Sequence, residues 1–189
     1  MLITTERLSL RPFTPDDVDD VLAYQRLPEV AQHMRWAPRG REQVVRAVEQ
    51  LVRENELREE GDCLSLAVVL PGKATVIGQV ELVWRSVEHR QGEVGYIFNP
   101  AHQGKGFATE AARAVLGLGF EELDLHRIIG RCSARNTASA ALLARLGMRR
   151  EAHFIGTALD EDGWREEYVF AMLRDEWRAH TAPATPDAL

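Results

Sequence analysis

The sequence predicts an α+β fold with about seven strands, and three observations lead to this prediction. Strand-like apolar runs follow one another closely in the middle of the chain, apolar residues change to helical spacing after a glycine-rich turn, and strand-like runs return toward the end. The 189 residues show no internal repeat and no change of composition that would separate two domains. We therefore expect one domain over residues 3–178, followed by a disordered tail over 179–189.

The first part of the chain is expected to form a strand and two helices. Residues 4–13 alternate between apolar and polar side chains, which is the period of a half-buried strand. Thr14, Pro15 and Asp17 then supply an N-cap, a first-turn proline and an acidic third position, so a helix is predicted to begin there. A second helix is predicted from about 41 to 59, because its valines and leucine share one face.

The middle of the chain predicts an antiparallel meander that leads into a helix. Three strand candidates lie near 63–70, 75–84 and 92–98, separated by turn residues or by a short polar stretch. Apolar residues at helical spacing then run from about 105 to 122. The chain therefore passes from strand to helix across the glycine-rich turn.

The last part of the chain predicts three more strands and one more helix. A short strand is expected over 126–132, and a helix over 136–146 that Gly147 closes. Two final strands are expected near 149–156 and 165–173, with a turn of Asp and Gly residues between them.

The charge balance and the apolar pattern exclude several classes of partner. Hydrophobic residues make up 45% of the chain and charged residues 28%, with a formal net charge of −6. An acidic chain argues against nucleic acid as a partner and suits a cationic or amine-bearing substrate better. No apolar run is long enough to span a membrane, and the first residues lack the pattern of a signal peptide. We expect a cytoplasmic protein without a membrane partner.

The metal-binding residue types are few and scattered. The six histidines lack the spacing of a metal site, and Cys63 and Cys132 lie in apolar runs, where a buried structural role is expected. No metal is therefore expected.

The glycine-rich turn has the features of an anion site. The first turn of a helix presents unpaired N–H groups with the positive end of the helix dipole behind them. Gly104 and Gly106 let the backbone take positive φ and let a phosphate approach it, and Lys105 adds a positive charge. The P-loop and the dinucleotide fingerprint both fail to match, because Phe107 and Ala108 follow the glycines. On these residues alone, a plain loop at a helix start remains an equal alternative.

Three segments together resemble the GNAT superfamily of N-acetyltransferases, and more closely its RimJ/RimL-like branch. Residues 103–108 (QGKGFA) fit the signature Q/R-x-x-G-x-G/A, and the strand-like run EVGYIFNP precedes them. The segment RNTAS at 135–139 is followed by Leu146 and Gly147, and the ending DGWREEYVFAMLRDEW is similar to the closing segment of that branch. The resemblance covers roughly residues 3–178, which would form one N-acetyltransferase domain.

The resemblance implies a fold and a cofactor site. The fold would be a mixed, mostly antiparallel sheet with helices on both faces, in which acetyl-CoA enters a split between two neighbouring parallel strands. The strand before the loop would follow the pantetheine arm, and the loop amides would hold the pyrophosphate. The residues carried over as cofactor contacts are Ile97, Phe98, Gln103, Gly104, Lys105, Gly106, Phe107, Ala108, Asn136 and Ser139.

Direct attack of an amine on a thioester needs a base, an oxyanion donor and an acid for the leaving thiolate. Backbone N–H near Ile97 is the expected oxyanion donor. Many family members carry a tyrosine acid seven residues after the asparagine, but Leu143 stands there, and Ser139 is the alternative that the branch offers. Glu93 is the first choice for the base and Glu81 the second, although either can equally be a solvent-facing strand residue. His89 is a third, because its titration range suits a base.

The acceptor is open at this point. Met34, Arg35 and Trp36 lie in the region that covers the acceptor pocket in this fold, and they or Tyr168 can grip substrate or simply pack. The preferred function is acetyl transfer to a primary amine, either a protein N-terminus or a small molecule. The alternatives are an antibiotic- or polyamine-modifying acetyltransferase, and a catalytically silent acyl-CoA-binding or partner-binding domain. A homodimer is plausible by family analogy.

Overall fold

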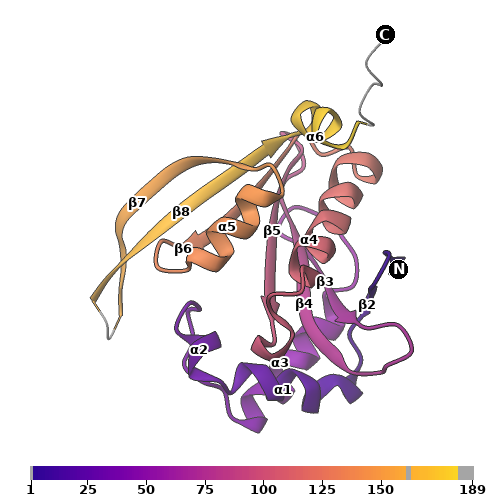
Figure 1. The fold of residues 1–189 in the computed structure, drawn as a ribbon, viewed down its shortest axis with the longest axis vertical. Coiled ribbons are helices and arrows are strands. Elements are labelled where there is room, and N and C mark those ends of the chain that lie inside the picture. The colour runs from indigo at the N-terminus through magenta and orange to yellow at the C-terminus, as the bar shows by residue number, and fades with distance from the viewer. Residues whose placement is uncertain (1, 161–162, 183–189) are drawn as a thin grey trace.

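A computed structural model describes residues 2–160 and 163–182, and within these ranges eight strands form a single sheet. The strands lie in the order β1-β2-β3-β4-β5-β6-β8-β7 (Figure 1). Their bounds are β1 Ile3–Thr4, β2 Ser9–Pro12, β3 Cys63–Val69, β4 Val76–Ser86, β5 Gln91–Phe98, β6 Arg127–Ser133, β7 Arg149–Asp160 and β8 Gly163–Leu173. The helices are α1 Val18–Gln25, α2 Pro28–Ala31, α3 Arg41–Arg53, α4 Phe107–Gly117, α5 Thr137–Arg145 and α6 Arg174–Thr181.

The predicted fold class is confirmed, because the sheet is mixed and mostly antiparallel. Among the described strand pairs, β5 and β6 alone run parallel. Their pairing extends from Gln91 opposite Arg127 to Val94 opposite Gly130. Beyond Val94 the two strands separate, since β5 stays paired with β4 as far as Phe98 and β6 stays paired with β8 as far as Ser133. The sheet is therefore split between β5 and β6, and Figure 1 shows the β7–β8 hairpin curving away from β5.

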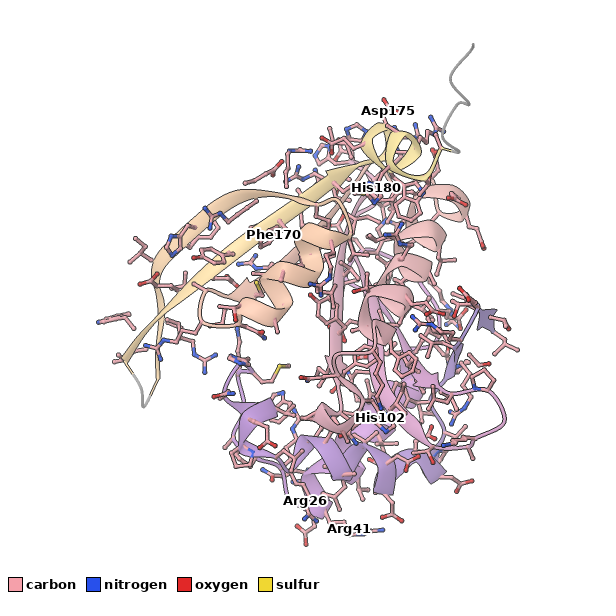
Figure 2. The ribbon with its side chains drawn as sticks, viewed as in Figure 1. Arg26, Arg41, His102, Phe170, Asp175 and His180 are labelled. Atoms are coloured by element: carbon pink, nitrogen blue, oxygen red, sulfur yellow. The ribbon has the colours of Figure 1, made fainter. Side chains whose placement is uncertain are left out.

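Helices cover both faces of the sheet, as expected. Strand β3 is buried on both sides because its side chains alternate between two clusters. Leu64, Leu66 and Val68 belong to the cluster that includes the buried residues of α4 and α5. Ala67 and Val69 belong to the other, which includes the buried residues of α1 and α3. Figure 2 shows Arg26 and Arg41 at the outer edge of this second helix layer, on the side away from the sheet.

Several predicted boundaries were wrong at the N-terminal end. The strand expected over 4–13 is two strands, because Thr5 N–H donates to Leu8 O and turns the chain between β1 and β2. This division makes eight strands instead of about seven. The helix expected over 41–59 ends at Arg53, because the chain then turns so that Asn55 bridges to Leu64 of β3.

Two helices were not predicted, and they lie at opposite ends of the chain. Helix α2 is a single turn that begins at Pro28. Helix α6 runs to Thr181 and so includes residues 179–181, which the sequence assigned to a tail. The rest of that predicted tail, 183–189, lies outside the described residues.

A partly buried ion pair connects β2 to the start of α1. The Arg11 guanidinium donates two hydrogen bonds to the Asp17 carboxylate, at 2.8 and 2.7 Å, and Thr14 N–H donates to the same carboxylate at 2.7 Å. Burial alone would raise the pKa of Asp17, but the bonds from Arg11 and Thr14 together hold that pKa below its usual range. The position of α1 against the sheet therefore depends on an ionised Asp17.

We expect Asp17→Asn to destabilise the protein by about 2–3 kcal/mol at pH 7, because Arg11 loses its charged partner. Since the folded pKa of Asp17 is depressed, its stabilising effect is present above the unfolded value of about 3.9 and is lost as pH falls through the folded value. Urea unfolding of both proteins from pH 7 to pH 2.5 measures this difference. Asp16→Asn, at an exposed neighbour, is the matched control. An equal effect of the two substitutions would contradict the account.

Candidate functional site

Two cavities lie at the split of the sheet, on opposite faces of β5. The first, called the split cavity, has a volume of about 730 Å³ and lies between the end of β5, the glycine-rich loop and α5. The second, called the α3 cavity, has a volume of about 600 Å³ and lies between α3, the loop before it, and strands β4 and β5. Met34 and Ile97 line both cavities. The two spaces therefore meet at the point where β5 leaves β6.

The glycine-rich loop ends in the N-terminus of α4, as the sequence predicted. Gly106 is the N-cap with φ +80°, and Gly104 also has positive φ, at +74°. The N–H groups of the first helical turn have no acceptor within the helix. The residues of this turn, Phe107, Ala108 and Thr109, line the split cavity, so the positive end of the helix dipole lies beside it.

A cluster of side chains from the turn between β1 and β2 holds this loop in place. The Arg7 guanidinium donates to Lys105 O at 3.0 Å and to Glu110 Oε2 at 2.7 Å. Thr5 Oγ1 donates to the other Glu110 oxygen at 2.6 Å. Burial raises the pKa of Glu110, but the hydrogen bonds from Thr5 and Arg7 outweigh it and leave that pKa below its usual range. An ionised Glu110 thus fixes the first turn of α4 and the loop before it.

Nine of the ten residues predicted to contact the cofactor line the split cavity, all of them within the described part of the chain. They are Ile97, Phe98, Gln103, Gly104, Gly106, Phe107, Ala108, Asn136 and Ser139. Lys105 does not line it, and its carbonyl is turned toward Arg7.

The start of α5 brings Asn136 and Ser139 beside β5. Asn136 is the N-cap, because its Oδ1 accepts from Ser139 N–H at 3.0 Å. The Ser139 hydroxyl lies 2.8 Å from the hydroxyl of Tyr96, which also lines the split cavity. Burial raises the pKa of Tyr96, so its hydroxyl stays protonated.

Tyr96 is a site residue that the sequence reasoning missed. It lies within the quoted segment EVGYIFNP, and strand alternation places it on the face opposite Ile97. The signal was therefore present in the strand next to the loop, although Ser139 is 43 residues away along the chain.

Glu81 lies in the α3 cavity, two residues beyond Gln79 on β4. The side chain of Glu81 lies across Gly95 of β5. A Cβ atom added at Gly95 would come within 2.4 Å of Glu81 Oε1, so any other residue at position 95 would displace the Glu81 side chain. Loss of water around the carboxyl, with the nearby charges of Glu54 and Glu93, raises the pKa of Glu81 to about 7. Its neighbour Glu54 is held by Ser65 Oγ at 2.6 Å and by Gln50 Nε2 at 2.7 Å.

The other two candidates for the base lie outside both cavities. Glu93 accepts a hydrogen bond from Arg85 Nε at 2.8 Å in a partly exposed ion pair. His89 is exposed in the turn between β4 and β5. Neither lines the split cavity or the α3 cavity.

The segment before α3 closes the cavities from one side. Met34 borders both, and its carbonyl accepts from Arg165 of β8 at 2.8 Å. Trp36 lines the α3 cavity, whereas Arg35 is exposed and lies 3.9 Å from Glu167. Tyr168 packs between the rings of His153 and Phe170 on the hairpin and lines neither cavity. Figure 2 shows Phe170 on this hairpin beside α5.

Two features are absent from the described ranges, a cluster of metal-binding side chains and a membrane-spanning helix. No group of three or more His, Cys, Asp or Glu residues is placed there to hold a metal ion. No helix in the same part of the chain is long and apolar enough to cross a membrane.

Comparison with known proteins identifies the family. The model of the Acetyltransferase (GNAT) domain family matches residues 7–149, which is more than half of the chain. The Uncharacterized N-acetyltransferase YnaD of Bacillus subtilis is 36% identical over 178 residues, covering 94% of this chain and 99% of that protein. The [Ribosomal protein uS5]-alanine N-acetyltransferase of Escherichia coli is 28% identical over 125 residues, covering 65% of this chain and 64% of that protein.

A solved structure agrees with the sequence comparisons. The acetyltransferase (GNAT family) from Bacillus anthracis superimposes with a TM-score of 0.81 at 31% identity, covering 93% of this chain and 99% of that one. The resemblance found in the sequence is therefore confirmed. This chain belongs to the GNAT superfamily of N-acetyltransferases and is an acetyl-transferring enzyme.

Proposed function

We propose that this enzyme transfers the acetyl group of acetyl-CoA directly to a primary amine while both substrates are bound. The observation that carries this proposal is the meeting of the two cavities at Ile97 and Met34. Acetyl-CoA fills the split cavity, and the amine approaches through the α3 cavity from the other face of β5. The thioester then lies in the split, where it can be reached from both sides.

The loop and the start of α4 hold the pyrophosphate. Unpaired first-turn N–H groups, two glycines with positive φ and the helix dipole favour an anion at this place. The side chain of Lys105 lies outside the cavity lining, so it contributes long-range attraction rather than a contact.

The free edge of β5 holds the pantetheine arm. Residues 95–98 are paired with β4 on one side, and their pairing with β6 has ended. Those of their backbone N–H and C=O groups that point away from β4 are available to the amide groups of the arm. In this proposal a backbone N–H near Ile97 stabilises the oxyanion, and Asn136 contacts the arm from the start of α5, since both residues line the split cavity.

Glu81 is the general base in this proposal, in preference to Glu93. Glu81 lines the cavity through which the amine approaches, and its pKa of about 7 lets it accept a proton near neutral pH. Glu93 is already paired with Arg85 and lies outside that cavity. Glu81 takes one proton from the ammonium, directly or through water, and the neutral amine attacks the thioester carbonyl.

Ser139 and Tyr96 act together on the leaving sulfur. As the C–S bond breaks and the amide forms, the attacking nitrogen loses its second proton and the leaving thiolate gains one, so the net proton transfer is from nitrogen to sulfur. The Ser139 hydroxyl is the donor, and the protonated hydroxyl of Tyr96, 2.8 Å away, supplies the hydrogen bond behind it. Ser139, supported by Tyr96, therefore takes the role that the family's tyrosine acid would have at the position of Leu143.

The acceptor is a small molecule or a protein N-terminus with a primary amine. The Escherichia coli relative acts, by its name, on an alanine of ribosomal protein uS5. Its similarity favours the RimJ/RimL-like branch. Thiol release from acetyl-CoA with a panel of N-terminal peptides, aminoglycosides, polyamines and amino acids tests the proposed activity. Binding of acetyl-CoA without turnover on any amine would favour a silent binding domain instead.

We expect Gly106→Glu to abolish acetyl-CoA binding, because the new carboxylate repels the pyrophosphate and the backbone has φ +80°. Isothermal titration measures the loss, which should exceed 100-fold in Kd. Gly61→Glu is the matched control, since Gly61 also has positive φ, at +97°, but lies in a turn that borders neither cavity. Unchanged binding by Gly106→Glu would refute the loop assignment.

We expect Glu81→Gln to lower kcat/KM at pH 8 by about 100-fold, because a general base contributes about that much. The wild-type rate should fall as pH drops below about 7, since Glu81 must be ionised to act. Glu93→Gln should leave the rate at pH 8 unchanged. The pH below which the rate falls should be lower in this variant, because the substitution removes a negative charge that raises the pKa of Glu81. A rate-deficient Glu93→Gln beside an active Glu81→Gln would reverse the assignment.

We expect Ser139→Ala and Tyr96→Phe to lower kcat by about 10-fold or more each, with KM for acetyl-CoA little changed. Because the two hydroxyls act as a unit, the double variant should lose far less than the product of the two effects. Tyr168→Phe, a tyrosine outside the cavities, is the control. Multiplicative losses in the double variant would show that the two residues act separately.

A further inference from the structure

The α3 cavity carries positive charge opposite its carboxylates, although the chain as a whole has a net charge of −6. Arg39 and Arg46 line it. Within residues 2–160 and 163–182, neither arginine forms an ion pair with a carboxylate. Three other partly buried arginines of the described residues, Arg11, Arg127 and Arg174, do have such a partner. An arginine that lines a cavity without one is available to an anionic group of a ligand.

Contacts with uncharged side chains fix the position of the Arg39 guanidinium. It lies 4.4 Å from the centroid of the Trp36 ring and donates through Nη1 to Gln25 Oε1 at 2.8 Å. The backbone N–H of Arg39 donates to Gln25 O at 3.0 Å, so both parts of the residue are fixed to the end of α1. Burial lowers the pKa of Arg39, because no negative charge compensates the lost water. The charge is thus oriented before any ligand binds.

Side-chain amides lead from Arg39 to the proposed base. The buried Gln25 donates through Nε2 to Gln79 Oε1 at 3.5 Å, and the Tyr24 hydroxyl donates to the same oxygen at 3.3 Å. Gln79 and Glu81 are two residues apart on β4 and face the same cavity, which separates them by about 6.6 Å along the strand. The lining of the cavity therefore includes a carboxylate, two side-chain amides and a guanidinium, with the amide of Gln25 in contact with both Arg39 and Gln79.

We propose that the acceptor is a small amino carboxylate, in which Arg39 binds the carboxylate while the amine faces Glu81. This inference rests on the acetyl transfer proposed above and names its class of substrate. The volume of about 600 Å³ is that of a small-molecule site. Glu81 and Arg39 line the same cavity, which favours a ligand that carries both an amine and a carboxylate, and Arg46 adds positive charge to the lining.

The same charges disfavour a polyamine. A second ammonium group at the far end of the cavity would meet Arg39 and Arg46. Glu54, the other carboxylate of the lining, already accepts hydrogen bonds from Ser65 and Gln50. One ammonium and one carboxylate on the ligand therefore match the cavity better than two ammonium groups.

Matched ligands test this proposal by isothermal titration into the protein saturated with CoA. We expect 4-aminobutanoate or 6-aminohexanoate to bind about 10- to 100-fold more tightly than butylamine or hexylamine, since a charged hydrogen bond contributes that much. Arg39→Gln should remove the difference between acid and amine, and Arg39→Lys should keep part of it. Arg26→Gln, at the exposed residue labelled in Figure 2, should leave it unchanged.

Three results would overturn the proposal. The first is equal or tighter binding of hexylamine or 1,6-diaminohexane, the second is an unchanged preference in Arg39→Gln, and the third is binding of an acidic N-terminal peptide where neither amino acid binds. Thiol release from acetyl-CoA with the same compounds separates this inference from the proposed function. Turnover of hexylamine as fast as 6-aminohexanoate would support acetyl transfer and contradict the carboxylate site. Tight, Arg39-dependent binding without any thiol release would support the carboxylate site and contradict acetyl transfer.

Discussion

The site depends on the point at which β5 and β6 stop pairing. The parallel ladder ends after Val94 because each strand then keeps only its antiparallel neighbour, β4 for β5 and β8 for β6. The last four residues of β5 thus border the split on one side, and the start of α5 reaches the same opening through the contact between Ser139 and Tyr96. A sheet without this split would have no room for a thioester beside its backbone.

The alternation of β5 gives the split two different sides. Tyr96 and Phe98 face the layer of α4 and α5, whereas Gly95 and Ile97 face the layer of α1 and α3. The first side meets a helix N-terminus and hydroxyl groups, which suit a pyrophosphate and a leaving sulfur. On the second side, the missing side chain of Gly95 admits Glu81, which suits an incoming amine. In the proposed mechanism, acetyl-CoA and the amine therefore lie on opposite faces of one short strand.

Local signals predicted the loop well and the catalytic groups less well. The turn at residues 103–108 needs positive φ angles that glycine supplies, so the turn and the helix after it could be predicted from the local sequence. Glu81 and Glu93 both alternate along strands, and the choice between them depends on Arg85, which pairs with Glu93 only in the folded sheet. Tyr96 meets Ser139 only after α5 packs onto β5, and α3 ends at Arg53 because Asn55 bridges to β3. These are contacts between distant segments, which periodicity does not report.

The central claim is that acetyl-CoA and the amine occupy the two cavities at the same time and react directly. Initial rates of thiol release, measured while both substrate concentrations are varied, test this claim most directly. Double-reciprocal plots with intersecting lines are the predicted result, because both substrates must be bound before the acetyl group moves. Parallel lines, with an acetylated enzyme isolated in the absence of amine, would contradict the account.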